Sequence, residues 1–182
     1  MISIAARTVT TTRITAASPL LFEDVYRCHA GSVHRFCLSQ VGDLALAEDL
    51  THETFTRAFV AYERAQPDPE TVRSWLLTIA RNLCTDHHRH RGRWRRLLWG
   101  MEKMPRAQSD VETMAQQRAD ISRVTTALAT LRERDRQLIG LRVAADLSYR
   151  EIAEVMGTTE QVVKVATFRA LTRLRTRLED QP

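Results

Sequence analysis

Cationic side chains are concentrated in one stretch of this chain, and the groups they are best suited to bind are phosphates and other anions. From Asp86 to Arg106 the sequence holds seven basic and two acidic residues, a net charge of +5. The whole chain of 182 residues also has a formal net charge of +5, so the remaining residues sum to zero. A positive block this concentrated predicts that the partner is a polyanion or an anionic membrane surface.

The residues nearest to a metal or catalytic pattern lie beside this block. Cys84 and His88 are four positions apart, which places them on one face of a helix, with His87 and His90 close by. This spacing permits zinc, but no second pair of ligands with a suitable spacing lies elsewhere in the chain. Nothing in the sequence surrounds these residues with a nucleophile, a base and an oxyanion donor. We therefore expect no catalysis, metal or cofactor, and zinc-dependent hydrolysis at Cys84 and His88 is the alternative.

The overall composition excludes several classes of protein. No apolar run approaches the roughly 18–20 residues that a membrane-spanning helix needs. The chain has 6 glycines and 5 prolines, too few for a turn-rich all-β fold. Its three cysteines, Cys28, Cys37 and Cys84, form no disulfide framework and indicate reduced thiols in the cytoplasm. Residues 1–18 are expected to be a disordered tail, with a transit peptide as the alternative.

Helical spacing of apolar residues dominates the rest of the chain and must position the groups described above. Three amphipathic helices are expected between residues 19 and 97. Gly42 ends the first of them, and Asp43 caps the second. The periodicity places Phe55, Phe59 and Trp75 in the core of this unit. The third helix runs directly into the basic block.

A second helical unit is expected at residues 110–180, after a linker at 98–109 where Gly100 and Pro105 interrupt the pattern. Apolar residues then return at helical spacing, and they include Leu128, Leu131, Leu138, Ile139, Leu141 and Val143. The periodicity therefore divides the chain into two helical units joined by a linker.

The second unit ends in the most specific local signal of the chain. The residues from Ser148 to Glu151 form a capping box that opens a short helix, which Gly157 can end in the left-handed conformation. Thr158 to Gln161 form a second capping box, which opens a longer, arginine-rich helix. A short helix, a glycine-containing turn and a longer basic helix describe a DNA-binding helix-turn-helix, with a plain helical hairpin as the alternative.

Three strings of the sequence, taken together, resemble one protein family. AEDLTHETF at residues 47–55, RSWLLTIARNL at 73–83 and LSYREIA at 147–153 are similar, in this order, to motifs of bacterial RNA polymerase sigma factors of the extracytoplasmic-function (ECF) type. The resemblance extends over about residues 20–178. It implies an all-α fold of two small helical domains joined by a flexible linker. These are a sigma-two helical bundle at 19–97 and a sigma-four helix-turn-helix domain at 110–180.

The resemblance also implies a function. The chain would bind core RNA polymerase and direct promoter recognition, DNA melting and transcription initiation. Its partners would be core RNA polymerase, promoter DNA and an anti-sigma factor, and only through the anti-sigma factor would it be connected to a membrane. No small-molecule substrate is expected. The alternative is a helix-turn-helix DNA-binding regulator that acts without polymerase.

The acidic face of the second helix is where the resemblance places core-polymerase binding. The residues assigned to it are Glu48, Asp49, His52 and Glu53, which project away from the buried stripe of that helix. Without the resemblance, the same residues would be read as an ordinary solvated face. His52 stands where the family typically has glutamine, and only histidine titrates near neutrality. The docking contact is therefore expected to be weaker or pH-sensitive.

The third helix and the basic block are where the resemblance places the minus-ten element and the melted strand. The residues assigned are Arg81, Asn82, Thr85, Arg89, Arg93, Arg95 and Arg96. Arginine supplies phosphate contacts, and asparagine can pair with a base edge. The loop at residues 63–71 matches the family loop that captures a flipped-out base. For residues 93–99, a basic amphipathic helix lying on a membrane is an alternative.

The arginine-rich last helix is where the resemblance places the minus-thirty-five element. The residues assigned are Arg142, Lys164, Phe168, Arg169 and Arg173. Three positions that are polar or cationic in the family are apolar here, namely Val162, Val165 and Ala166. Fewer phosphate contacts weaken binding, and valine offers a base only apolar contact, for example with a thymine methyl. We therefore expect an unusual minus-thirty-five sequence, weak DNA binding, or a protein partner on this face.

Overall fold

The computed structural model of the chain describes residues 21–97 and 115–179, with side chains at 21–91 and 123–179. The tail expected at 1–18 and the linker expected at 98–109 lie outside the described residues. Within the described residues, every regular element is a helix and none is a strand. The predicted all-α fold is therefore confirmed.

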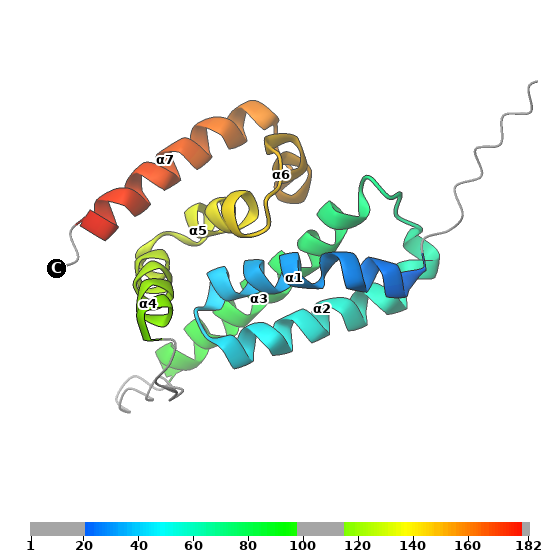
Figure 1. Cartoon of the computed structure of the whole chain (residues 1–182), viewed down its shortest axis with the longest axis horizontal. Helices are drawn as coiled ribbons and strands as arrows, with labels where there is room; N and C mark the ends of the chain where they lie inside the picture. Colours follow the sequence, from blue (N-terminus) through cyan, green and yellow to red (C-terminus); the bar gives the residue numbers. More distant parts are fainter. Residues whose placement is uncertain (1–20, 98–114, 180–182) are drawn as a thin grey trace, which may run out of the picture.

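Three helices form the first unit and pack against one another, as Figure 1 shows. They are α1 (Phe22–Val41), α2 (Leu44–Ala65) and α3 (Val72–Leu97). Gly42 ends α1 with a φ of 70°, a left-handed conformation that glycine adopts without strain. The Asp43 carboxylate then accepts a hydrogen bond from the backbone N–H of Leu46 at 2.9 Å and caps α2. Both predicted boundaries are confirmed.

The core of the first unit confirms much of the predicted pattern but differs from it at Phe59 and Trp75. Side chains at its centre include Phe36, Ala47, Phe55, Leu76 and Leu77. Phe59 was expected among them but is 64% exposed, because Ala58 takes the inward position of that turn. Trp75 is half-buried, with its ring centroid 6.3 Å from that of Tyr62. It therefore lies at the edge of the core.

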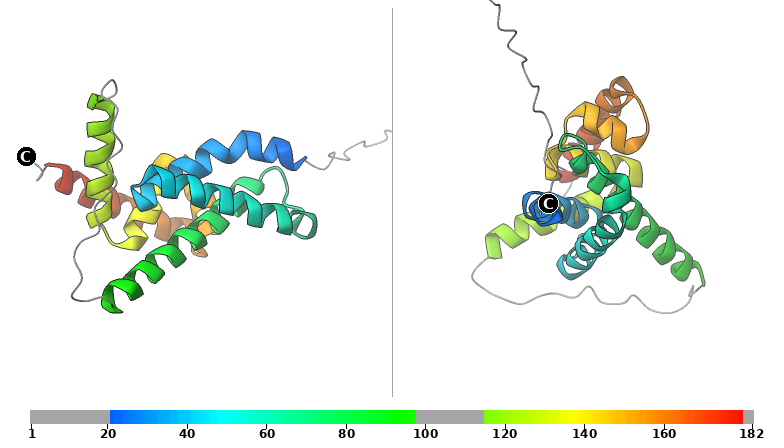
Figure 2. Two further views of the ribbon diagram at one scale, coloured as in Figure 1. Left: turned by 90° about the horizontal axis from the view of Figure 1, so that it is seen from below. Right: turned by 90° about the vertical axis from the view of Figure 1, so that its right-hand side faces the viewer.

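The described part of the second unit, residues 115–179, consists of four α-helices and a π-helical turn, seen from two further directions in Figure 2. They are α4 (Ala115–Thr130), α5 (Glu133–Ile139), the π-helical turn η2 (Gly140–Ala144), α6 (Tyr149–Met156) and α7 (Glu160–Glu179). The predicted capping box is present: the Ser148 hydroxyl accepts from the backbone N–H of Glu151, whose carboxylate accepts from the backbone N–H of Ser148. Gly157 ends α6 with a φ of 63°.

The start of α7 differs from the prediction by one residue. The helix begins at Glu160, and the Thr159 hydroxyl accepts from the backbone N–H of Val162 at 3.4 Å. Thr159, not Thr158, is therefore the cap. The third helical position is then a valine, which has no side-chain acceptor to complete a capping box.

The two units share one continuous hydrophobic core, which the sequence did not predict. Helix α1 packs against η2, and α3 packs against α6 (Figures 1 and 2). The Ser32 hydroxyl and the Arg35 guanidinium of α1 donate to the carbonyl oxygens of Ala145 and Ala144, at 3.1 and 3.0 Å. The two helical units therefore pack against each other in the described parts of the chain.

Gly140 lies at a close approach between the units. A Cβ at this position would lie 2.5 Å from the Ser39 hydroxyl oxygen and would also collide with the Gln40 side-chain amide. The π-helical turn that Gly140 begins inserts an extra residue into the helical path. Leu141 is fully buried, whereas Val143, which continues the helical spacing in the sequence, is 64% exposed.

Candidate nucleic-acid interface

The acidic face of α2 is exposed along its whole predicted extent. Glu48, Asp49, His52 and Glu53 are all exposed, because Ala47, Leu50, Thr51 and Thr54 occupy the buried side of the helix. The Glu53 carboxylate forms an ion pair with the Arg57 guanidinium at 2.7 Å. Within the described residues, Glu48 and Asp49 form no ion pair. Two carboxylates of this face are therefore free to meet a cationic partner.

Some of the predicted minus-ten residues on α3 have exposed side chains, and others are hydrogen-bonded to the second unit. Asn82 and Arg89 are exposed, and the Arg89 guanidinium lies 3.9 Å from the Asp86 carboxylate. The Arg81 guanidinium instead donates to the Val155 carbonyl oxygen of α6 at 2.9 Å. The side chains of Arg93, Arg95 and Arg96 lie outside those that the structure describes.

Thr85 is engaged in the same way as Arg81. Its hydroxyl oxygen accepts a hydrogen bond from the Gln137 side-chain amide of α5 at 3.0 Å. Arg73, at the start of α3, donates to the Ala145 carbonyl oxygen. The second unit therefore covers part of the surface of α3 that the sequence assigns to DNA. No local sequence signal predicts these contacts, because nothing in the sequence around Gln137 or Val155 indicates that either residue contacts α3.

Cys84 and His88, the pair considered for zinc, lie in different surroundings. Cys84 is buried beside Cys37, and this neighbouring thiol together with burial raises the pKa of the Cys84 thiol. His88 Nε2 lies 3.2 Å from the Gln40 carbonyl oxygen and 3.2 Å from Arg136 Nη2. Burial and the Arg136 charge lower the His88 pKa, which favours the neutral imidazole. Within the described residues, no three His, Cys, Asp or Glu side chains are grouped so that they could hold a metal ion.

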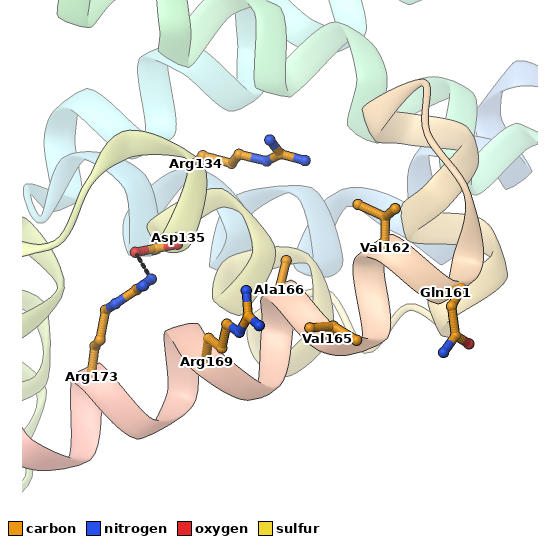
Figure 3. Close-up of a pocket in the computed structure, with 8 residues that line it drawn as sticks. All are labelled: Arg134, Asp135, Gln161, Val162, Val165, Ala166, Arg169 and Arg173. Atoms are coloured by element: carbon orange, nitrogen blue, oxygen red, sulfur yellow. Dashed lines mark hydrogen bonds and ion pairs between the residues drawn. The ribbon is translucent and has the colours of Figure 1, made fainter.

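The outward side of α7 carries the predicted minus-thirty-five residues in different states. Phe168 is 73% exposed, and Arg169 is exposed. Lys164 pairs with Glu160 of the same helix at 2.8 Å. Arg173 forms a 2.7 Å ion pair with the buried carboxylate of Asp135, and this contact joins α7 to α5 (Figure 3). Arg173 therefore has a structural contact that the sequence did not predict.

Arg142 also has partners inside the second unit. Its guanidinium donates to the Leu147 carbonyl oxygen at 2.9 Å and lies 5.2 Å from the centroid of the Tyr149 ring. It therefore braces the loop between η2 and α6, the loop that leads into the helix-turn-helix.

A shallow hollow lies between α5 and α7, and its charge is mainly positive. The residues that line it are Arg134, Asp135, Gln161, Val162, Val165, Ala166, Arg169 and Arg173 (Figure 3). Because Arg173 neutralises Asp135, the charges of Arg134 and Arg169 remain unbalanced. The hollow is therefore suited to an anion rather than a cation.

Family models match both helical units. The model of sigma-70 region 2 matches residues 25–94, and the model of sigma-70 region 4 matches residues 121–174. The ECF RNA polymerase sigma factor SigM of Bacillus subtilis is 30% identical over 159 residues, which are 86% of this chain and 94% of SigM. This chain belongs to the ECF sigma factors.

Two further comparisons agree with this assignment. The ECF RNA polymerase sigma factor BldN of Streptomyces coelicolor is 31% identical over 160 residues, although the chain spans only 61% of the length of BldN. The sigma factor RpoE from Bartonella quintana, whose structure was solved in complex with the anti-sigma factor NepR, matches with a TM-score of 0.71 at 25% identity. That match covers 88% of this chain and 98% of RpoE.

The family regions of this ECF sigma factor coincide with its helical units. Region 2 covers the acidic face of α2 and the engaged side of α3, and region 4 covers the helix-turn-helix of α6 and α7. Among the described residues of the sigma factor, no helix is both long and apolar enough to span a membrane.

Proposed function

We propose that this chain binds core RNA polymerase in the cytoplasm, directs it to promoters, and helps to open the DNA there, without catalysing a reaction itself. The observation that carries the proposal is the combination, in one chain, of an exposed acidic α2 face in region 2 and a helix-turn-helix in region 4. A regulator that acts without polymerase needs only the second of these.

The acidic face supplies the polymerase contact in this proposal. Glu48 and Asp49 are exposed and unpaired within the described residues, so their charges are available to a cationic surface. Exposed complementary charges mainly raise the rate of association and select the partner. This surface is therefore suited to a factor that must bind and dissociate in each round of initiation.

The two DNA elements are assigned to different units. Helix α3 faces the minus-ten element through Asn82 and Arg89, and α7 faces the minus-thirty-five element through Lys164, Phe168 and Arg169. Arg81 and Thr85 belong to the first set, but they are held by α6 and α5. DNA can therefore contact Arg81 and Thr85 only when the two units separate. In this proposal, binding to core polymerase causes that separation.

An anti-sigma factor is proposed as the second protein partner. RpoE, which this chain resembles in structure, was solved in complex with the anti-sigma factor NepR. A partner that holds the two units together would keep α3 covered and the chain inactive. A membrane would be involved only through such a partner.

Transcription with purified components tests the proposal. The chain is mixed with core RNA polymerase and a promoter library, and start sites are mapped from the run-off transcripts. We expect specific transcripts that require both the chain and the polymerase. DNA sequences selected equally well without polymerase, together with no binding to core polymerase at moderate salt, would favour the polymerase-independent regulator.

The charge-reversing variant Asp49→Lys tests the α2 face within this proposal. Replacing an exposed carboxylate that contacts a cationic surface introduces repulsion, so affinity for core polymerase should fall at least tenfold, roughly 1.4 kcal/mol. Glu23→Lys is the control, because it reverses the charge of another exposed carboxylate, one that lies on α1 and pairs with Arg27. Normal polymerase affinity in Asp49→Lys would remove the assignment of this face.

A further inference from the structure

The outward face of α7 carries apolar side chains where a DNA-facing helix usually carries polar ones. Val163, Thr167 and Ala170 turn inward and are buried. Val165 and Phe168 lie three residues apart on the opposite side, where they are 42% and 73% exposed. A valine and a phenylalanine exposed together have a cost in water that a bound partner would remove.

Positive charge surrounds this apolar pair, and the nearby acids are already neutralised. Arg134 and Arg169 form no ion pair with any described residue, and both line the hollow beside Val165 (Figure 3). Asp135, which lines the hollow, is bound to Arg173 at 2.7 Å, and Glu160 of α7 is bound to Lys164 at 2.8 Å. A cationic frame around an apolar centre complements a partner that is anionic outside and apolar within.

The DNA major groove has this arrangement where thymine occurs. Phosphates line its edges, and the 5-methyl group of thymine is the apolar group on its floor, which valine and phenylalanine can contact. An apolar protein surface would match Val165 and Phe168 but would leave Arg134 and Arg169 without partners. The charge pattern therefore favours DNA over a protein as the occupant of this face.

We propose that Val165 and Phe168 select thymine in the promoter element bound by α7, through contact with its 5-methyl group. The inference rests on the proposed function, because α7 must enter the major groove. Arg134 and Arg169 then supply phosphate attraction that does not depend on sequence, and the apolar pair supplies part of the specificity. Val162 and Val165 both line the hollow, but Val162 leaves α7 in a different direction in Figure 3 and is not assigned this role.

Replacement of thymine by deoxyuridine tests this directly, since deoxyuridine differs only by the missing methyl. The complex of the full chain with core polymerase selects its preferred element from a randomised library, and each thymine of that element is then replaced singly. We expect one or two positions at which the replacement lowers affinity about fourfold, the equivalent of one methyl group returned to water.

Two variants connect each position to a side chain. In Val165→Ala and in Phe168→Ala the thymine-to-deoxyuridine affinity ratio should fall to about one at the position that the residue contacts. Both residues are exposed, so neither truncation should disturb the fold. Val124→Ala is the matched control, because Val124 is 41% exposed on α4 and should leave every ratio unchanged.

The outcomes distinguish this inference from the proposed function. If the complex selects an element and transcribes from it, but deoxyuridine is tolerated at every position, the methyl contact is wrong while the sigma-factor function stands. If the variants keep all ratios but weaken capture of core polymerase, the face binds protein and the inference is overturned. If no element is selected, both proposals fail.

Discussion

The two helices assigned to DNA, α3 and α7, present their side chains in opposite ways. On α3, Arg81 and Thr85 are hydrogen-bonded to the second unit, whereas on α7 Phe168 and Arg169 are exposed. Both helices are basic and amphipathic, so composition alone does not separate them. What separates them is packing: the second unit lies on α3, and no described element lies on the outer face of α7. The DNA contact proposed for α7 is therefore available in this arrangement, whereas the one proposed for α3 requires the two units to open.

The substitution Gly140→Ala is expected to have the largest effect on the difference between the covered α3 and the exposed α7. The added Cβ would collide with Ser39 and Gln40 of α1, so the contact between the units should weaken by about 1–3 kcal/mol. Opening should expose Arg81 and Thr85 and increase binding of single-stranded minus-ten DNA severalfold. Fluorescence anisotropy with a labelled oligonucleotide measures the binding, and small-angle X-ray scattering measures the opening.

Gly31→Ala is the control for this prediction. Gly31 is exposed on α1, and a Cβ there would meet only the end of the Arg35 side chain, at 3.4 Å. The substitution should stabilise the helix by about 0.8–1 kcal/mol without opening the chain. Unchanged scattering and unchanged DNA binding in Gly140→Ala would mean that covering by the second unit does not limit α3.

Arg173→Ala should show that one residue assigned to DNA on α7 has mainly a structural role. Removing the guanidinium leaves the buried Asp135 carboxylate unpaired, which should cost about 1–3 kcal/mol of unfolding free energy. Chemical denaturation measures this loss. Arg177→Ala is the control, because Arg177 is exposed and forms no ion pair with a described residue, so its change should stay within about 0.5 kcal/mol. Equal stability of the two variants would contradict the structural role.

The contact between the units should also weaken in acid, through His88. Burial and Arg136 lower the His88 pKa below its ordinary value, with His87 adding to this effect and Glu133 opposing it. A histidine that packs neutral stabilises the folded form fully above the unfolded-state pKa of about 6.5, and this contribution is lost as the pH falls from there toward the lowered folded-state value.

The variant His88→Gln should flatten that pH dependence, because glutamine does not titrate. Thermal denaturation across pH 5 to 8, on the order of the range in which histidine titrates, compares it with the parent chain. The exposed His90→Gln variant is the control and should keep the parent profile. If His88→Gln and the parent lose stability in parallel, His88 does not set the acid sensitivity.

Arg89→Ala should have the smallest effect on stability but a measurable one on DNA binding. Its ion pair with Asp86 is long and exposed, so the unfolding free energy should change by less than about 0.5 kcal/mol. If Arg89 contacts one phosphate, the salt dependence of promoter binding should fall by about 0.7–0.9 in the log–log slope. Arg27→Ala, which removes exposed ion pairs on α1, is the control. An unchanged slope in Arg89→Ala would remove this residue from the interface.

Much of the fold, and the exposure of the acidic α2 face, could be predicted from sequence because the signals are local. Gly42, Asp43 and the capping box at Ser148 each act through their own backbone, so their positions identify the helix ends. The exposure of Glu48 and Asp49 follows from the helical spacing of the buried residues around them. Thr159 was missed because two neighbouring threonines offer the same cap, and only the observed hydrogen bond selects one.

The arrangement of the two units could not be predicted in the same way. Helical spacing shows that a face is apolar, but it does not show what covers it. The π-helical turn at Gly140 shifts the residues that follow it. In the sequence Gly140 indicates only a weak point in a helix, and its contact with Ser39 and Gln40 is seen only in the structure. Contacts between residues a hundred positions apart leave no local trace in a single sequence.

The distance between the two units when core polymerase binds tests most directly whether α3 must be uncovered. Cys28 is exposed, whereas Cys37 and Cys84 are buried, so a chain with the additional substitution Thr176→Cys can be labelled with a fluorescent pair on α1 and α7. We predict efficient energy transfer in the free chain and a marked loss of transfer when core polymerase is added, with no loss in Asp49→Lys. Energy transfer that stays the same in the polymerase-bound chain, while transcription proceeds, would contradict the claim that α3 must be uncovered.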